Sequence, residues 1–265
     1  MLEGKTLLII CPSYPNEDDS LIANNFIKYQ VEELKYFFEK IIVIAPVYQS
    51  YGFLKKDKLS KDYCYDNVYV YYPRCYYIPI FWLSKIIIDN RLKVVDGIIK
   101  SKNLHFDIIH AHFTWPSGYI GVKLKEKYRT PLVITIHENG DWLDQELIMY
   151  HPLINIAWSG ADALIRVNSK DVPILKHYNK QTYGIPNGFS PAFHPIDIHV
   201  AREKLSLEKD KKIIFSIGYL VKRKGFNYLI KAISHVCSQR DDVICFIGGM
   251  GHEKKALQSQ IVRLH

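Results

Sequence analysis

The clearest indication of the fold class comes from two runs, Phe106-Asp-Ile-Ile-His-Ala-His112 and Leu132-Val-Ile-Thr-Ile-His137. Each run is apolar through its middle and ends on a histidine. Short runs that stay apolar without alternation are typical of parallel strands that are buried on both faces of a sheet. The two runs therefore predict neighbouring interior strands that present polar side chains where they end.

Similar runs recur through the first part of the chain, and amphipathic stretches of helical length lie between them. Strands are expected at Thr6–Cys11, Lys40–Val47, Val68–Tyr72 and Ala161–Asn168, and helices at 82–100, 117–128 and 142–160. A further helix is indicated by Ile27, Val31, Leu34 and Phe38, whose spacing places them on one helical face. The alternation predicts an α/β fold built on an open, doubly wound, Rossmann-like sheet.

A proline-rich segment separates this region from a second one. Ile185-Pro-Asn-Gly-Phe-Ser-Pro-Ala-Phe-His-Pro195 interrupts any regular structure, and strands are expected again at Lys212–Gly218 and Asp242–Gly249. Two strands leave the faces and one edge of a doubly wound sheet uncovered. We therefore predict a complete N-terminal domain over residues 1–190, and the incomplete start of a second Rossmann-like domain over 191–265.

The composition indicates a globular protein with a basic surface. Hydrophobic residues make up 48% of the chain, and Lys and Arg outnumber Asp and Glu by 35 to 27, which favours anionic partners. The five cysteines are scattered without a C-x-x-C pair, as expected for reduced thiols, and no signal peptide or membrane-spanning run is evident. We predict a cytoplasmic protein, and no nucleic-acid partner, because no recognised binding module occurs.

His110, His112 and His137 are the first candidates for chemistry. Histidines at neighbouring strand ends can line a polar cleft, bind sugar hydroxyls or act as acid or base. The alternative is that each is a structural histidine with satisfied hydrogen bonds. Their spacing matches no metal-ligand signature, and the chain has no D-x-D motif, so no metal ion is expected.

Two loops are candidates for binding. Pro12–Asn25 lacks the G-x-G-x-x-G of a dinucleotide site and suits a loop that closes over a sugar-like acceptor, although an ordinary surface loop has the same composition. Gly218-Tyr-Leu-Val-Lys-Arg-Lys-Gly225 combines glycine, three cations and a helix start, which are the parts of a diphosphate site. Its position after a strand favours that interpretation over a solvated basic turn. Gly248-Gly-Met-Gly251 is a weaker signal of the same kind.

The run Tyr71–Trp82 is rich in aromatic residues. Together with Lys85, Arg91 and Lys93 it suits docking on an anionic membrane surface. Packing of these rings into the core of their own domain is the alternative, and we favour it.

In this order the motifs resemble glycosyltransferase family 4, the retaining enzymes with the GT-B fold. The resemblance is carried by Tyr14-Pro15 with Asn25–Leu34, Asp107-Ile-Ile-His-Ala-His112, Val133-Ile-Thr-Ile-His137, Ile185-Pro-Asn-Gly188, and Gly218–Gly225 leading into Tyr228-Leu-Ile-Lys-Ala232. The fold it implies is GT-B-like, with a complete Rossmann-like domain followed by the first part of a second.

The resemblance also implies roles for individual residues. His137 corresponds to the catalytic-site histidine that faces the transferred sugar. Tyr14, Asn25 and His112 are expected at the acceptor, and Asn187 and Gly188 between the domains. Donor binding is expected of Gly218, Arg223, Lys224 and Gly225. The position of the arginine that normally partners this lysine holds Tyr219, and the family's acidic donor-binding segment would lie beyond residue 265.

The activity that the resemblance implies is the transfer of a sugar, with retention, from a nucleotide-sugar donor to a glycan or lipid-linked acceptor, without a cofactor. Such an enzyme is expected in the cytoplasm or peripherally on the inner face of the membrane. Two alternatives remain. One is a sugar-nucleotide 2-epimerase of the same architecture, and the other is a non-catalytic or partner-dependent homologue that is inactive by itself.

Overall fold

The computed structural model describes residues 2–20, 24–49, 60–76, 84–138, 140–190 and 192–264. The chain divides into two units, Met1–Ala192 and Phe193–His265. The second half of the aromatic run, from residue 77, lies outside the described residues.

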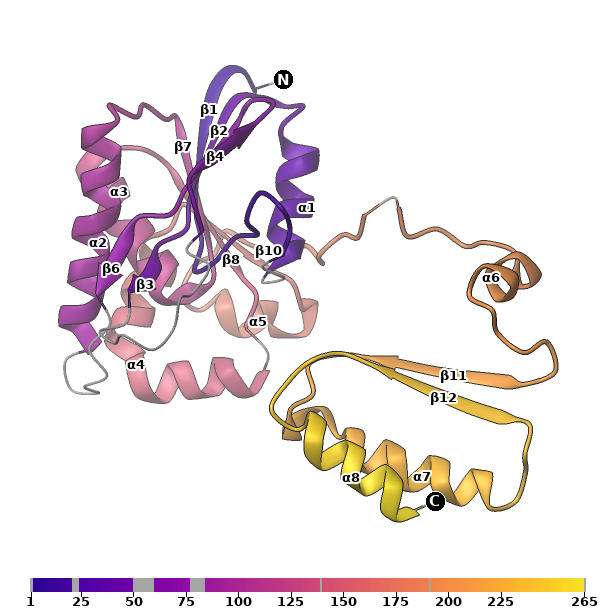
Figure 1. Ribbon diagram of the computed structural model, residues 1–265. Coiled ribbons are helices and arrows are strands. Elements are labelled where there is room, and N and C mark those ends of the chain that lie inside the picture. The colour runs from indigo at the N-terminus through magenta and orange to yellow at the C-terminus, as the bar shows by residue number, and fades with distance from the viewer. Residues whose placement is uncertain are drawn as a thin grey trace. The chain divides into compact units, whose positions relative to one another are not determined.

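An eight-stranded sheet runs through the first unit in the order β10-β9-β8-β7-β1-β2-β5-β4 (Figure 1). Its strands are β1 (Leu2–Ile10), β2 (Phe38–Ile44), β4 (Tyr63–Tyr65), β5 (Val68–Tyr71), β7 (Ile108–His112), β8 (Leu132–Ile136), β9 (Ala163–Arg166) and β10 (Thr182–Gly184). All neighbours are parallel except β4 and β5. The chain builds outward from β1 in both directions, which is the doubly wound arrangement predicted from the sequence.

Helices cover both faces of this sheet (Figure 1). The helix α1 (Asn25–Leu34) packs on one face, while α2 (Ser84–Ser101), α3 (Tyr119–Tyr128) and α4 (Gly140–Gly160) pack on the other. A short helix, α5 (Val172–Leu175), precedes β10, and the strands β3 (Val47–Gln49) and β6 (Arg74–Tyr76) form a separate pair. The sequence analysis did not predict that pair, nor did it predict β4, α5 or β10.

The first helix is shorter than its apolar spacing predicted. It ends at Leu34, and Phe38 begins β2 instead of continuing the helical face. The side-chain amide of Asn67 donates to the carbonyl oxygens of Lys35 and Phe38, at 2.9 and 2.8 Å. These long-range contacts satisfy the carbonyl group of Lys35, which the helix end leaves free, and that of Phe38 at the start of β2, and no local pattern could reveal them.

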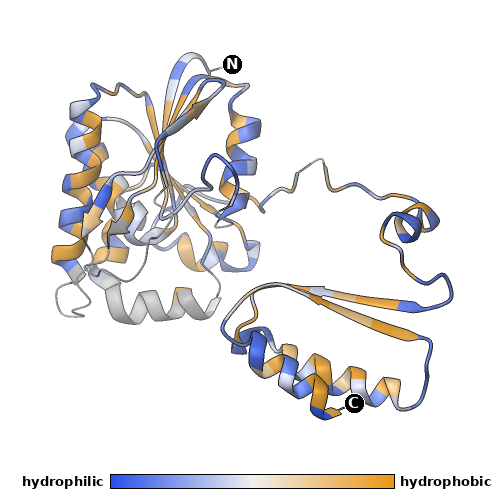
Figure 2. Cartoon of the chain, in the orientation of Figure 1, coloured by the Kyte–Doolittle hydropathy of each residue, from blue (hydrophilic) through white to orange (hydrophobic). Residues whose placement is uncertain are grey.

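The second unit is much smaller. It contains α6 (Ile198–Lys204), β11 (Lys212–Ile217), α7 (Phe226–Cys237), β12 (Val243–Gly248) and α8 (Lys254–Leu264), with β11 and β12 parallel. Its strands are strongly apolar (Figure 2). Phe215 and Ile217 of β11 are nevertheless 65% and 73% exposed. One sheet face of this unit is therefore uncovered within residues 193–264.

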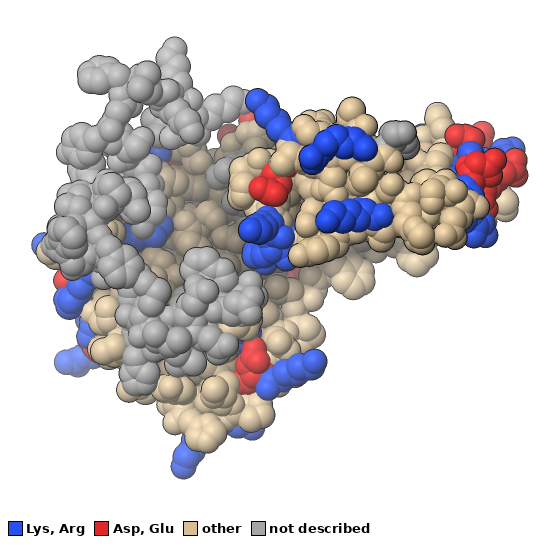
Figure 3. Space-filling model, turned by 90° about the horizontal axis from the view of Figure 1, so that it is seen from below, with Lys and Arg blue, Asp and Glu red and all other residues tan. Residues whose placement is uncertain are grey.

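Charged groups are spread over the surface. Figure 3 shows Lys and Arg side chains scattered among other residues on the face in view. Arg91 is buried and donates a hydrogen bond of 2.9 Å to the carbonyl of Pro46, so this residue agrees with the favoured interpretation, packing within the domain, and not with a membrane-facing surface. In the described part of the chain, no helix has the length and apolar character needed to cross a membrane.

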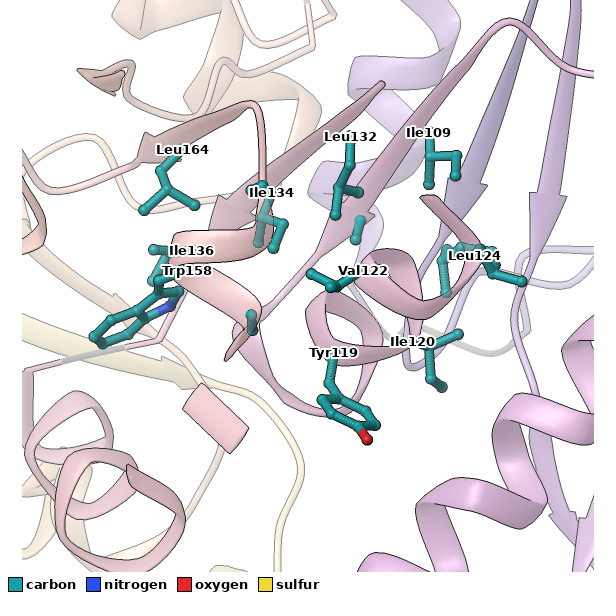
Figure 4. Packing of buried hydrophobic residues seen from close by; sticks show 14 of the residues in the cluster. Ile109, Tyr119, Ile120, Val122, Leu124, Leu132, Ile134, Ile136, Trp158 and Leu164 are labelled. Atoms are coloured by element: carbon teal, nitrogen blue, oxygen red, sulfur yellow. The ribbon is translucent and has the colours of Figure 1, made fainter. Parts of the chain in front are cut away.

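Side chains of the first unit form one core cluster on each face of the sheet. On β1, Leu8 and Ile10 belong to the cluster beneath α2, α3 and α4, whereas Leu7 and Ile9 belong to the cluster beneath α1. Figure 4 shows Leu132 and Ile134 of β8 beside Val122 of α3. Burial on both faces explains why these strands are apolar nearly throughout.

Candidate active site

The strand that carries His110 and His112, β7, pairs with β8, the strand that leads to His137. His110 and His112 are two residues apart on β7 and therefore face the same side of the sheet. The Nε2 atom of His110 lies 2.7 Å from the hydroxyl of Thr135, and Nδ1 of His112 lies 2.9 Å from Nε2 of His137, the residue that follows β8. The fold thus brings together the three histidines that the sequence singled out.

Aromatic rings enclose His137. Its ring centroid lies 5.2 Å from that of His112, with the planes only 16° apart. It lies 4.6 Å from the ring of Phe26, on α1, and 5.0 Å from the ring of Phe113, which follows β7. These contacts hold the imidazole in place and exclude water from much of its surface.

Burial lowers the pKa of all three histidines. It lowers the pKa of His110 to about 4, and together with the neighbouring His110 and Arg166 it lowers that of His137 to about 3. The pKa of His112 also lies well below its ordinary value, first because of burial and then because of the two neighbouring histidines. All three imidazoles are therefore uncharged near neutral pH, and each offers one N–H group and one lone pair.

Two ring nitrogens of this cluster are buried without a partner among the described residues, Nε2 of His112 and Nδ1 of His137. A buried polar atom without a partner is costly, and such atoms are concentrated where a ligand or a water completes the bonding. The His112–His137 pair can accept or donate a hydrogen bond at each end, according to its tautomer.

Glu138 adds a buried carboxyl group next to His137. Its Oε1 atom accepts a hydrogen bond of 2.7 Å from the backbone N–H of Thr114, while Oε2 has no partner among the described residues. Burial raises its pKa, against the effect of this hydrogen bond and of Arg166. Position after a strand end was the only signal in the sequence for this residue.

Tyr14, predicted at the acceptor, lies wholly within the core beneath α1. Its hydroxyl is 2.9 Å from that of Tyr65. The next residue, Pro15, accepts hydrogen bonds from the hydroxyls of Tyr63 and Tyr72, at 2.8 and 2.6 Å. This tyrosine cluster, which the sequence analysis missed, anchors the loop after β1. A direct contact of Tyr14 with an acceptor stays a prediction that this burial does not favour.

Asn25, also predicted at the acceptor, is the first residue of α1. Its side-chain Oδ1 is buried and has no partner among the described residues. The preceding Asn24 has a φ of 54° and donates through its side chain to the hydroxyl of Ser13, at 2.7 Å. The two ends of the long loop are therefore tied together, and the role of Asn25 stays a prediction.

The predicted interdomain residues Asn187 and Gly188 run past α1. The side-chain oxygen of Asn187 accepts a hydrogen bond of 3.1 Å from Gln30. Gly188 lines a cavity of about 460 Å³, to which His110 and Thr135 also contribute. This cavity lies on the α1 side of the sheet, beside the histidine cluster.

In the second unit, the predicted donor loop is an exposed basic turn. Lys222, Arg223 and Lys224 form a single 3₁₀ turn, and none of them makes an ion pair with another described residue. Gly225 then adopts a φ of 70° and caps α7, a conformation that glycine adopts without strain. The turn therefore presents three cations beside free N–H groups of a helix N-terminus, which is a suitable arrangement for a phosphate group.

Gly218 lies where the two glycine-containing loops of this unit meet. Its N–H donates to the carbonyl of Gly248 at 3.0 Å, and the N–H of Leu220 donates to that of Met250 at 2.8 Å. The side chain of Tyr219, at the position of the family's arginine, is 54% exposed. The described residues contain no group of three or more His, Cys, Asp or Glu side chains arranged to hold a metal ion.

Comparison with known proteins identifies two matching family models. Residues 41–193 match Glycosyltransferase Family 4, and residues 197–265 match Glycosyl transferases group 1. The putative teichuronic acid biosynthesis glycosyltransferase TuaC of Bacillus subtilis is 24% identical over 254 residues, which cover 88% of this chain and 62% of that protein. The chain spans about half the length of the curated relatives it matches, from 38% to 62% for three of them.

Solved structures share the fold. Sucrose-phosphate synthase from Thermosynechococcus elongatus superposes with a TM-score of 0.66 at 18% identity, over 97% of this chain and 73% of that one. The Anabaena protein HepE, solved in complex with UDP-glucose, gives 0.62 at 17% identity over 98% and 66%. The α/β, GT-B-like fold predicted from the sequence is confirmed. Because one family model matches more than half of its residues, the chain belongs to glycosyltransferase family 4.

Proposed function

We propose that the protein is a retaining glycosyltransferase that transfers a sugar from a nucleotide-sugar donor to a glycan or lipid-linked acceptor. One observation carries the proposal: the uncharged His112–His137 pair at the carboxyl edge of a sheet of family 4 type. Ligands of open α/β sheets bind beyond the carboxyl ends of the strands, which is where these side chains lie.

An uncharged imidazole suits glycosyl transfer. Positive charge develops on the sugar ring as its bond to the leaving group breaks. A protonated histidine would oppose that charge, whereas a neutral one can hydrogen-bond a sugar hydroxyl without repulsion. The low pKa of His137 therefore agrees with a position beside the transferred sugar.

The basic turn at Lys222–Lys224 would stabilise the leaving diphosphate. Negative charge develops on that group during transfer, and prearranged cations and helix N–H groups lower the barrier without a metal ion. The complex of HepE with UDP-glucose supports a nucleotide-sugar as the class of donor. The proposal thus names a class of donor, a nucleotide-sugar, and a class of acceptor, a glycan or a lipid-linked molecule.

An anionic membrane surface is a further proposed partner, in a cytoplasmic protein that acts at the inner face of the membrane. The formal net charge of +8 supports it. In a vesicle pelleting assay, we expect more binding to anionic than to neutral vesicles at low salt. Equal binding to both would rule this partner out.

The proposal is tested by incubating the protein with nucleotide-sugars, with and without glycan and lipid-linked acceptors. We expect acceptor-dependent release of nucleotide, and a fall in kcat of roughly 100-fold in His137→Ala, because a group that contacts the reacting sugar is lost. Lys224→Met should weaken donor binding in calorimetry, whereas Lys255→Met, an exposed change on α8, should not.

The other outcomes identify the alternatives. Release of nucleotide without any acceptor, together with a 2-epimerised sugar, would indicate an epimerase. The absence of donor binding to the wild-type chain would favour a partner-dependent homologue. That candidate is supported by Tyr219, which stands at the position of the family's arginine in the basic turn loop.

A further inference from the structure

Arg166, which sequence analysis did not single out, contacts the backbone on both sides of His137. It is the last residue of β9, it pairs in register with Ile136, and its side chain is 1% exposed. Its Nη1 atom donates to the carbonyl oxygens of Ile136 and Glu138, at 3.0 and 2.5 Å. These are the two residues adjacent to His137 in the chain.

The guanidinium group extends the sheet beyond the end of β8. The backbone hydrogen bond from the N–H of Val167 to the carbonyl of Ile136 is long, at 3.5 Å, so the pairing of β8 and β9 is weak at this point. A planar guanidinium with several fixed donors can supplement this weak bond to Ile136 and bridge to the carbonyl group of Glu138, beyond the end of β8.

Asp171 fixes the orientation of that guanidinium. Its Oδ2 atom accepts from Nε and Nη2 of Arg166, at 2.9 and 2.5 Å, and its side chain is 23% exposed. The carboxylate approaches the edge of the guanidinium that is not used for the carbonyl groups. All three nitrogens of Arg166 are therefore engaged, and the side chain has a single orientation.

We propose that the Arg166–Asp171 pair positions His137. The pair fixes the peptide groups on either side of His137 and so keeps the His137 imidazole within hydrogen-bond distance of His112. Arg166 makes no hydrogen bond to the imidazole and acts through the backbone. The importance of this geometry for transfer rests on the function proposed above, whereas the positioning itself does not. A merely structural ion pair would stabilise the first unit without affecting the state of His137.

A test of this proposal has to separate the effect of Arg166 from the effects of the other groups that face His137. His110 and His112 approach from β7, Glu138 is next in the chain, Arg166 approaches from β9, and the phenyl ring of Phe26 covers one side. Loss of Arg166 changes the backbone contact directly and leaves the other groups in place. The state of the His137 imidazole is therefore the readout that separates positioning from stability.

The experiment is nitrogen NMR of the 265-residue chain with ¹⁵N-labelled histidine. The signals of His137 are assigned by their loss in His137→Gln. In Arg166→Lys we expect the Nδ1 and Nε2 shifts of His137 to move toward the average of the two tautomers, because the imidazole is released from His112. The control is Arg91→Lys, since Arg91 is also a buried arginine that bonds a backbone carbonyl, but in a different part of the unit.

The Arg91 variant should lose comparable stability and keep wild-type His137 signals. If Arg166→Lys does not fold, Asp171→Asn takes its place, because it retains the arginine and removes only the charge that orients it. Wild-type His137 signals in the folded Arg166→Lys or Asp171→Asn chain would overturn the proposal.

Activity gives a separate readout. Where transfer is measurable, Arg166→Lys should lower kcat roughly 10- to 100-fold and leave the KM for the donor within about twofold, because the fault is a misplaced group. A wild-type protein without any transfer activity would contradict the proposed function, while the NMR result would still decide the positioning role.

Discussion

At the scale of single residues, burial makes the histidine cluster sensitive to acid. In the unfolded chain a histidine takes up a proton near pH 6.5, whereas burial keeps His110 and His137 neutral in the folded protein down to about pH 4 and 3. Between pH 6.5 and these lower values, the unfolded state binds more protons than the folded state. The contribution of these histidines to the free energy of unfolding therefore has its full value above pH 6.5 and decreases as the pH is lowered toward 4.

His110 alone should account for a loss of roughly 3 kcal/mol in the free energy of unfolding between pH 6.5 and 4. In His110→Gln that part of the pH dependence should disappear, because glutamine does not titrate. Urea unfolding followed by tryptophan fluorescence measures it, since all four tryptophans precede residue 193 and report on the first unit. The difference in the free energy of unfolding between the wild-type protein and His110→Gln at pH 7.5 gives the packing cost of the substitution. Parallel pH profiles for the two proteins would contradict the prediction.

At the scale of elements, the loops that follow β11 and β12 depend on each other. A Cβ atom on Gly249 would lie 1.9 Å from the carbonyl oxygen of Gly218, and the φ of Gly249 is 145°. A Cβ on the adjacent Gly248 would make only ordinary contacts, the nearest at 3.6 Å. Gly249, which follows β12, thus allows the backbones of the two loops to approach closely. This contact supports the loop of the basic turn at its first residue, Gly218.

Gly249→Ala should loosen the turn at residues 218–225, because the two loops must separate to admit the methyl group. We expect amide hydrogen exchange there to accelerate roughly tenfold to a hundredfold, and donor affinity to fall with it. Gly248→Ala is the matched control and should change exchange little. Equal protection in the two variants, measured by mass spectrometry, would show that the loops are not coupled in this way.

At the scale of the whole molecule, the two units differ in how much core they possess. The first unit buries two clusters drawn from its own residues, one on each face of its sheet. In the second, the buried cluster consists of Leu220, Phe226, Ile230 and Leu257 among the described residues. Stability should therefore be concentrated in the first unit.

A chain truncated after residue 192 should consequently fold, with a tryptophan-detected urea midpoint close to that of the 265-residue chain. In the longer chain, amides of β11 and β12 should exchange well before those of β1 and β7, because fewer apolar contacts protect them. Hydrogen exchange and equilibrium unfolding measure the two expectations. An unfolded truncated chain would show that the first unit depends on residues beyond 192.

Local patterns of residues predicted the fold class, most of the strands and helices, and the family. Hydrophobic periodicity and the ordered motifs are local properties, so they predicted the strands that carry His112 and His137 and the basic turn that contains Lys224. The assignment of those residues to donor or acceptor binding stays a prediction.

Which side chains contact one another could not be predicted in this way, because it depends on how distant segments pack. Tyr14 enters the core because tyrosines about 50 residues later reach its loop, and the first helix ends at Leu34, where Asn67 bonds the carbonyl of the next residue, Lys35. Arg166 reaches both neighbours of His137 because β9 pairs with β8. In the chain, Arg166 is 30 residues from Ile136 and 28 residues from Glu138. Such contacts depend on strand order and register, which periodicity in a single sequence does not encode.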